Sequence, residues 1–217
     1  QFFVALAHTD TIAYFSEGEN PDRIRVSNLN IFPSEMKENL LFSMSFDPTI
    51  HYETMQSKLD PYGVTKGLSK SVPRRLFADC GAFQFRNSSE PILDDGTPLD
   101  AGVAWEYYSA KHLNSGFEWE EVLLCSPDHI ITVDMSDEEV SNRFKFIEKN
   151  AGPFLDLSKQ DTRVSAIGVI HGRTEEERIQ QYEMFKSVGY RYVALGGMVP
   201  YSSKHDEALR IVAGIEN

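Results

Sequence analysis

Polar and glycine residues follow four apolar runs of this sequence, and their types suit acid–base chemistry and ligand binding. The four segments are Asp79-Cys80-Gly81-Ala82-Phe83-Gln84, Val133-Asp134-Met135, Ile170-His171-Gly172 and Leu195-Gly196-Gly197-Met198. An aspartate at the end of an apolar run is costly to bury unless it is paired or used. If the runs are barrel strands, their carboxyl ends face one mouth, where active sites lie.

The residue types indicate both functional and structural roles. Asp79 and Asp134 could divide the work of a general acid/base and of an acceptor for substrate donors. Phe83 could offer its aromatic face to a planar ring, and Gly196-Gly197 would let a ligand approach the backbone closely. Each of these residues could instead have a structural role. Asp79 could be a turn or cap residue, and Asp134 could orient the next helix. His171 could be a core histidine with satisfied hydrogen bonds, and Cys80 and Cys125 could be buried small residues.

Short apolar runs alternate with longer amphipathic segments. We predict strands over 3–7, 40–45, 75–83, 129–135, 164–171 and 192–198. We predict helices over 101–113, 136–150, 174–188 and 204–215, two of which begin with a Ser/Thr-x-x-Glu capping box and one of which ends at Gly189. Strand–helix alternation predicts an α/β fold with a parallel sheet.

A TIM (β/α)8 barrel is the expected architecture. The alternative, a doubly wound dinucleotide-binding sheet, needs glycines after the first strand, and residues 8–11 contain none. A barrel has eight strands, and only six are recognised here. Either two strands lie in the polar stretches 14–39 and 46–72, or the C-terminal end of the barrel is missing. We therefore expect 1–217 to form a single barrel domain with roughly six of the eight strand–helix units.

Composition limits the function classes. The chain has 217 residues, a formal net charge of −12 and 41% hydrophobic residues, which is typical of a globular domain. The charge argues against a general nucleic-acid coat protein. Two cysteines cannot form a disulfide scaffold or a four-cysteine zinc site, so we expect a reducing cytoplasm. We expect no membrane association, since no run approaches the length of a membrane helix. The chain opens on Gln1, which suggests a processed or trimmed product.

The motifs together resemble those of the tRNA-guanine transglycosylases. Residues 79–84 resemble that family's Asp-Ser-Gly-Gly/Ala-Phe-Gln motif, and 195–198 resemble its later Gly-Gly-Leu-Ala loop. Val133-Asp134 stands where the family keeps its base-recognising aspartate, and 169–172 where it has Val-Gln-Gly-Gly. The resemblance covers roughly residues 75–200, with the motifs in the family's order.

The resemblance implies a TIM barrel that exchanges guanine for a 7-deazaguanine (preQ0-like) base in a nucleic acid, through an aspartate nucleophile and a covalent intermediate. It implies that Asp79 is the catalytic acid/base, that Phe83 stacks on the base and that Asp134 accepts its N–H groups. The implied substrate-binding set is Cys80, Phe83, Gln84, Asp134, His171, Leu195, Gly196 and Gly197.

Three departures from the family pattern change these expectations. Cys80 replaces the usual Ser, and His171 replaces the usual Gln, which would change base recognition. Val199-Pro200-Tyr201 resembles the DNA-modifying 7-deazaguanine transglycosylases (DpdA-type), so DNA is favoured over tRNA as the partner. The family's nucleophile, and its structural zinc site of three Cys and one His, would follow Asn217. We therefore expect this chain to lack both, to hold no other cofactor, and to act as a homodimer or with a second subunit.

Two other functions stay open. One is a metal-dependent TIM-barrel hydrolase, for which the potential ligands are His8, Asp10, His51, Asp79, His129, Asp134, His171 and His205. The other is a non-catalytic partner subunit of a transglycosylase. A nucleic-acid substrate needs basic residues, and the modest cluster available comprises Lys66, Lys70, Arg74, Arg75 and Arg86.

Overall fold

The computed structural model of the chain describes residues 4–5, 11–15, 23–27, 39–45, 47–49, 52, 74–198 and 205–216. These residues form an α/β fold, as the alternation of apolar runs and amphipathic segments predicts. The chain divides into two compact units, residues 1–79 with 107–123 and residues 80–106 with 124–217. Within the described part, no helix is both long and apolar enough to cross a membrane.

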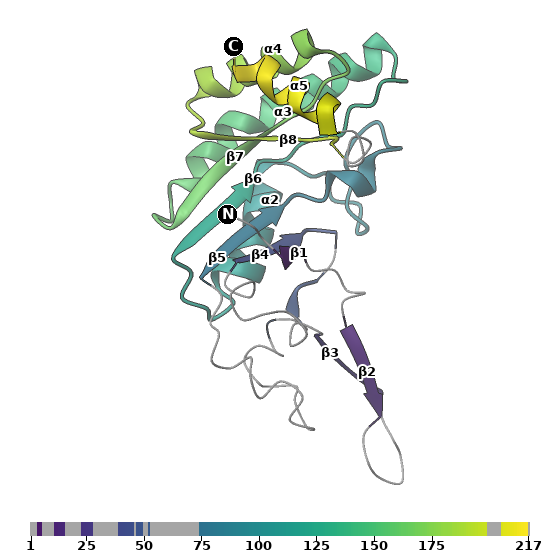
Figure 1. Ribbon diagram of the computed structural model, residues 1–217. Helices are drawn as coiled ribbons and strands as arrows, with labels where there is room; N and C mark the ends of the chain where they lie inside the picture. Colours follow the sequence, from purple (N-terminus) through teal and green to yellow (C-terminus); the bar gives the residue numbers. More distant parts are fainter. Residues whose placement is uncertain are drawn as a thin grey trace. The chain divides into compact units, whose positions relative to one another are not determined.

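The main sheet has six strands in the order β1-β4-β5-β6-β7-β8 (Figure 1). These strands are β1 (Val4–Ala5), β4 (Asn39–Ser43), β5 (Arg75–Asp79), β6 (Glu121–Cys125), β7 (Val164–Ile170) and β8 (Tyr192–Leu195). The pairs β1–β4, β4–β5 and β7–β8 are parallel, as in βαβ units. A separate two-stranded antiparallel sheet joins β2 (Thr11–Phe15) to β3 (Arg23–Ser27), so the strands found within 11–27 do not extend the main sheet.

Helices follow several of these strands along the chain. They are α2 (Ala101–Tyr108), which continues as the π-helical turn η5 (Ser109–Leu113), α3 (Asp137–Ser158), α4 (Glu175–Val188) and α5 (His205–Glu216). The predicted helix start at Ser136 is confirmed, because its side chain accepts from the Glu139 N–H while the Glu139 carboxylate accepts from the Ser136 N–H. Helix α3 runs past the predicted end at residue 150 and includes Pro153.

The core of the second unit lies between β7 and the helices α3 and α4 (Figure 1). Ile147, Ala151 and Phe154 are buried on one face of α3, at the spacing of a helical stripe. Phe185 of α4 is fully buried and lies against Gly168, where an added Cβ would be 2.5 Å from the phenyl ring. The glycine therefore allows α4 to approach β7 closely.

One predicted strand is wrong. Residues 129–135 form an irregular segment and a turn, and the strand lies earlier, at Glu121–Cys125. Its burial alternates until both Leu124 and Cys125 are buried. Val133, in contrast, is 74% exposed, which a strand covered on both faces would not allow. The correction moves the end of this strand nine residues away from Asp134.

Removing the Ser136 cap tests the start of α3. We expect Ser136→Ala to lower the free energy of unfolding by about 1 kcal/mol, because it leaves helix N–H groups without their acceptor. The control is Ser187→Ala, on an exposed serine late in α4, for which we expect a change below about 0.5 kcal/mol. Urea unfolding measures both, and equal losses would contradict the role of the cap.

Candidate functional site

Asp79 and Cys80 stand at the carboxyl end of β5. Asp79 is the last residue of that strand, and its Oδ2 accepts a 3.1 Å hydrogen bond from the Ser43 hydroxyl at the end of β4. Cys80 follows and is fully buried. Gly81 then takes φ 75°, the left-handed region that favours glycine, and starts the 3-10 turn η4 (Ala82–Phe85). The motif Asp-Cys-Gly is thus a sharp strand-to-helix turn.

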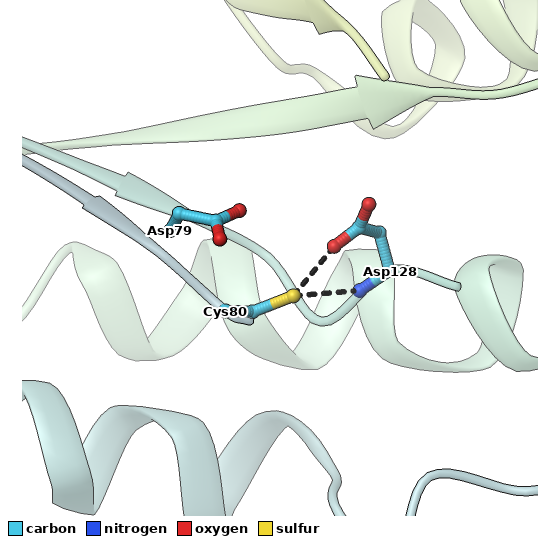
Figure 2. A group of neighbouring side chains, drawn as sticks. All are labelled: Asp79, Cys80 and Asp128. Atoms are coloured by element: carbon cyan, nitrogen blue, oxygen red, sulfur yellow. Dashed lines mark hydrogen bonds between the residues drawn. The ribbon is translucent and has the colours of Figure 1, made fainter. Parts of the chain in front are cut away.

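Asp128, three residues after β6, is bound to Cys80 (Figure 2). The Cys80 thiol donates to Asp128 Oδ1, and the Asp128 backbone N–H donates to Cys80 Sγ at 3.4 Å. Asp128 is 2% exposed. A buried carboxylate needs such donors, because the cost of removing it from water is high.

His171, which directly follows β7, is the second side chain that is hydrogen-bonded to this carboxyl group. Its Nε2 is hydrogen-bonded to Asp128 Oδ2, and its backbone N–H donates to Gln181 Oε1 at 2.7 Å. The imidazole is 2% exposed. Its other nitrogen, Nδ1, is buried and has no hydrogen-bond partner among the described residues.

Gly196, after β8, lies directly against the His171 ring. A Cβ at this position would be 2.2 Å from His171 Cε1, so no side chain fits while the imidazole is in place. The Gly196 N–H donates to the Ile170 carbonyl at 2.8 Å, which continues the β7–β8 pairing to this point. Gly197 is exposed and has φ 68°. The predicted residues Cys80, His171 and Gly196 therefore gather around Asp128, and we call these four the Asp128 cluster.

Phe83 and Gln84 lie on the exposed side of the turn that follows Cys80. Phe83 is 61% exposed, which is unusual for a large apolar ring. The Arg86 guanidinium lies over the ring, 4.4 Å from its centroid, and Arg86 also donates to the Phe83 carbonyl at 3.2 Å. An exposed aromatic face with a neighbouring cation suits stacking against a planar ring.

A buried arginine holds the backbone just after this turn. Arg143 of α3 donates to the carbonyls of Arg86 and Ser88 at 3.0 and 3.1 Å and to His129 Nδ1 at 3.0 Å. His129 Nε2 lies 3.1 Å from the same Ser88 carbonyl. His129 is therefore neutral, with its proton on Nε2. Burial, and then the neighbouring Arg143 charge, lower the pKa of His129 to about 4.

Asp134, the predicted base-recognising residue, is exposed on the turn that follows Thr132. The Thr132 hydroxyl donates to Asp134 Oδ1 at 2.5 Å, and this hydrogen bond lowers the pKa of the carboxyl. The structure does not bring Asp134 into the Asp128 cluster. Its role in base recognition stays a prediction, as does the substrate-binding role that the resemblance implies for Leu195, which is half-buried.

Sequence reasoning missed Asp128 and Arg143. Asp128 follows the apolar run Val122-Leu123-Leu124-Cys125 by three residues, just as polar residues follow the other strands closely. Recognition of that run as the strand would have identified Asp128 as the strand-end acid. Arg143 gives no sequence signal, because an arginine in a polar helix is ordinarily exposed.

The basic cluster is largely paired where it is described. Arg74 forms an ion pair with Glu120 at 2.7 Å and Arg75 with Glu121 at 3.3 Å, which neutralises both charges. Lys66 and Lys70 lie outside the described residues. Of the described residues of this basic cluster, Arg86 is the one that lies at the turn after β5, over the Phe83 ring.

Potential metal ligands converge at one point within the described residues. Asp79, Cys80 and Asp128 offer ligand atoms that lie within 4.8 Å of one another. This proximity follows from the peptide bond between Asp79 and Cys80 and from the hydrogen bond between Cys80 and Asp128, so it does not by itself assign an ion. His8, Asp10 and His51 lie outside the described residues, and His129 and Asp134 are engaged as described above.

Comparison with known proteins adds no family to these observations. No protein-family model matches the chain, and no curated protein gives a significant sequence match. The likeness to the guanine transglycosylases therefore depends on the motifs and on where the structure places them.

The pH dependence of stability tests the position of His129. Its pKa is about 4 in the folded chain and near 6.5 when unfolded. Between these values the unfolded chain binds a proton that the folded chain does not, so the free energy of unfolding falls as the pH drops. We expect His129→Gln to remove about 1–2 kcal/mol of that fall between pH 6.5 and 4. Identical slopes in urea unfolding of the two proteins would contradict this assignment.

A double-mutant cycle tests the packing of His171 on Gly196. We expect Gly196→Ala alone to destabilise the chain by about 2 kcal/mol or more, because its methyl group has no space. In a His171→Ala background, the same change should cost less than about 0.5 kcal/mol. Thermal unfolding of the four proteins gives the coupling, and simple additivity would show that the two residues do not share this space.

Proposed function

We propose that the protein is a guanine transglycosylase that exchanges guanine for a 7-deazaguanine base in a nucleic acid, with DNA favoured over tRNA, on a TIM-barrel scaffold. One observation carries this proposal. Three of the residues that the family resemblance predicts to bind substrate, Cys80, His171 and Gly196, come from separate strand ends and lie in one cluster, in which Cys80 and His171 are buried. Each of the three directly follows a strand, β5, β7 or β8, which is where a barrel enzyme carries its site residues.

The chemistry of the strand-end residues supports a base-binding role. Guanine and its deaza analogues are planar rings with both donor and acceptor groups on their edges. Phe83 provides an exposed aromatic face for such a ring, and the exposed Gly197 leaves the backbone open to close approach. In this function Asp79 acts as the general acid/base, and its hydrogen bond from Ser43 holds the carboxylate at the end of β5.

Asp79→Asn tests the proposed reaction. In the full-length protein, which is expected to include the nucleophile, this variant should lose incorporation of labelled guanine into DNA by about 100-fold or more, because the amide cannot exchange protons while it keeps the acceptor for Ser43. The control is Asp94→Asn, an exposed aspartate in the loop after η4, which should keep the wild-type rate.

The assay also separates the alternatives. It is run on DNA and on tRNA, with folding of each variant checked by circular dichroism. If Asp79→Asn exchanges guanine at the wild-type rate, Asp79 has no part in the mechanism. Binding of guanine by the wild-type protein without any exchange would favour a non-catalytic partner subunit.

A further inference from the structure

We propose that Arg178 and Gln181 of α4 form an anion-binding site beside the loop after β7, and that this site takes a backbone phosphate of the nucleic-acid substrate. The two residues lie on one face of α4, since positions three apart in a helix are neighbours. The source of the phosphate rests on the proposed function, whereas the anion site rests on the buried donors alone.

Arg178 is a buried cation without a counter-charge. The residue is 8% exposed, and its Nε is buried with no hydrogen-bond partner in the described part of the chain. A guanidinium keeps its proton in proteins, so burial cannot neutralise this charge. Burying a charge without a partner costs free energy, which a bound anion would recover.

Gln181 adds a neutral donor whose orientation is fixed. Its Oε1 accepts the His171 backbone N–H at 2.7 Å, so its amide nitrogen lies on the side away from that N–H. Gln181 is 4% exposed, and this nitrogen, Nε2, has no partner among the described residues. Two neighbouring side chains therefore hold N–H groups without acceptors. Such a set of donors suits an anion with several oxygens, and it excludes a cation.

Gly172 sets the position of Arg178 at the carboxyl end of β7. It is the second residue after that strand, and a Cβ there would lie 2.9 Å from Arg178 Cγ and 3.0 Å from the Arg178 backbone nitrogen. The loop after β7 therefore lies directly on α4 at this side chain. The preceding residue, His171, belongs to the Asp128 cluster. A nucleotide joins a base to a phosphate, the anion that a guanidinium binds through two parallel hydrogen bonds.

The acidic residues in the first turn of α4 do not neutralise Arg178. Glu175 and Glu176 are exposed, so water and salt screen their charges. Glu177 is paired instead with Arg173, at 2.6 Å. Arg178 therefore keeps a positive charge for a ligand, in a chain whose net charge is −12.

Arg178→Met tests the anion site without nucleic acid. Methionine keeps an unbranched apolar chain against Gly172 and removes the charge. The control is Arg163→Met, which removes an arginine that precedes β7 and is paired with Asp161. We expect inorganic phosphate, added at constant ionic strength, to raise the melting temperature of wild type and of the control by about 2–4 °C, and that of Arg178→Met by less than about 1 °C.

The same measurement detects a purely structural role. Without phosphate, Arg178→Met should melt at or above the wild-type temperature, because it removes an unpaired buried charge. A clearly lower melting temperature would assign the guanidinium to the fold and overturn the inference. A phosphate response equal to that of wild type would also overturn it.

Gln181→Glu tests the second donor. Glutamate keeps an acceptor for the His171 N–H and replaces the amide nitrogen with a carboxylate oxygen. This variant should lose the phosphate response, because the new oxygen repels an anion and competes for Arg178. A wild-type response would remove Gln181 from the site.

The salt dependence of DNA binding tests the source of the phosphate. Each phosphate contact contributes about 0.7 to the slope of log Kd against log salt concentration for a single strand. We expect Arg178→Met to lower this slope by about that amount for a single-stranded DNA oligonucleotide, and Arg163→Met to leave it unchanged. An unchanged slope in Arg178→Met would overturn the assignment to nucleic acid.

These results separate the inference from the proposed function. A reduced slope in Arg178→Met, with no guanine exchange by the full-length protein on DNA or tRNA, would contradict the transglycosylase proposal and support the phosphate site. Normal exchange with an unchanged slope would do the reverse.

Discussion

The buried carboxylate of Asp128 is the constraint on which the second unit depends. A carboxylate removed from water is stable only with hydrogen-bond donors or a compensating proton, and here its hydrogen-bond partners follow the ends of two other strands. Cys80 bonds one oxygen and His171 the other. Each partner follows the end of a strand, Cys80 after β5 and His171 after β7, so these hydrogen bonds join residues that are far apart in the chain.

Steric crowding explains why residue 196, near this carboxyl group, is a glycine. The imidazole that Asp128 holds fills the space where a side chain of residue 196 would lie, so the hydrogen bond and the glycine are two parts of one arrangement. Gly168 allows the same kind of close approach between β7 and Phe185 in the core. At positions 168 and 196, glycine thus marks a place that a large neighbouring side chain already occupies.

Local features of the fold could be predicted from the sequence, whereas the central residue of the site could not. The caps at Ser136 and Thr174 and the end of α4 at Gly189 are encoded within a few residues, and the structure confirms them. The strand at Glu121–Cys125 is hard to recognise because two acids precede its short apolar run. The longer stretch that follows, residues 129–135, is predicted as the strand instead. That shift concealed Asp128, whose importance comes from partners 48 and 43 residues away. Only the pairing of the strands brings those partners together.

The hydrogen bonds from Arg143 to the carbonyls of Arg86 and Ser88 affect the thermodynamics of ligand binding. Fixing the backbone of a loop costs conformational entropy, of about 1–2 kcal/mol for each residue. Here that cost is met when the chain folds, since a buried side chain of α3 fixes the loop before any ligand arrives. A planar ligand that stacks on Phe83 therefore meets an already ordered surface, and its affinity is not reduced by the need to order the segment behind it.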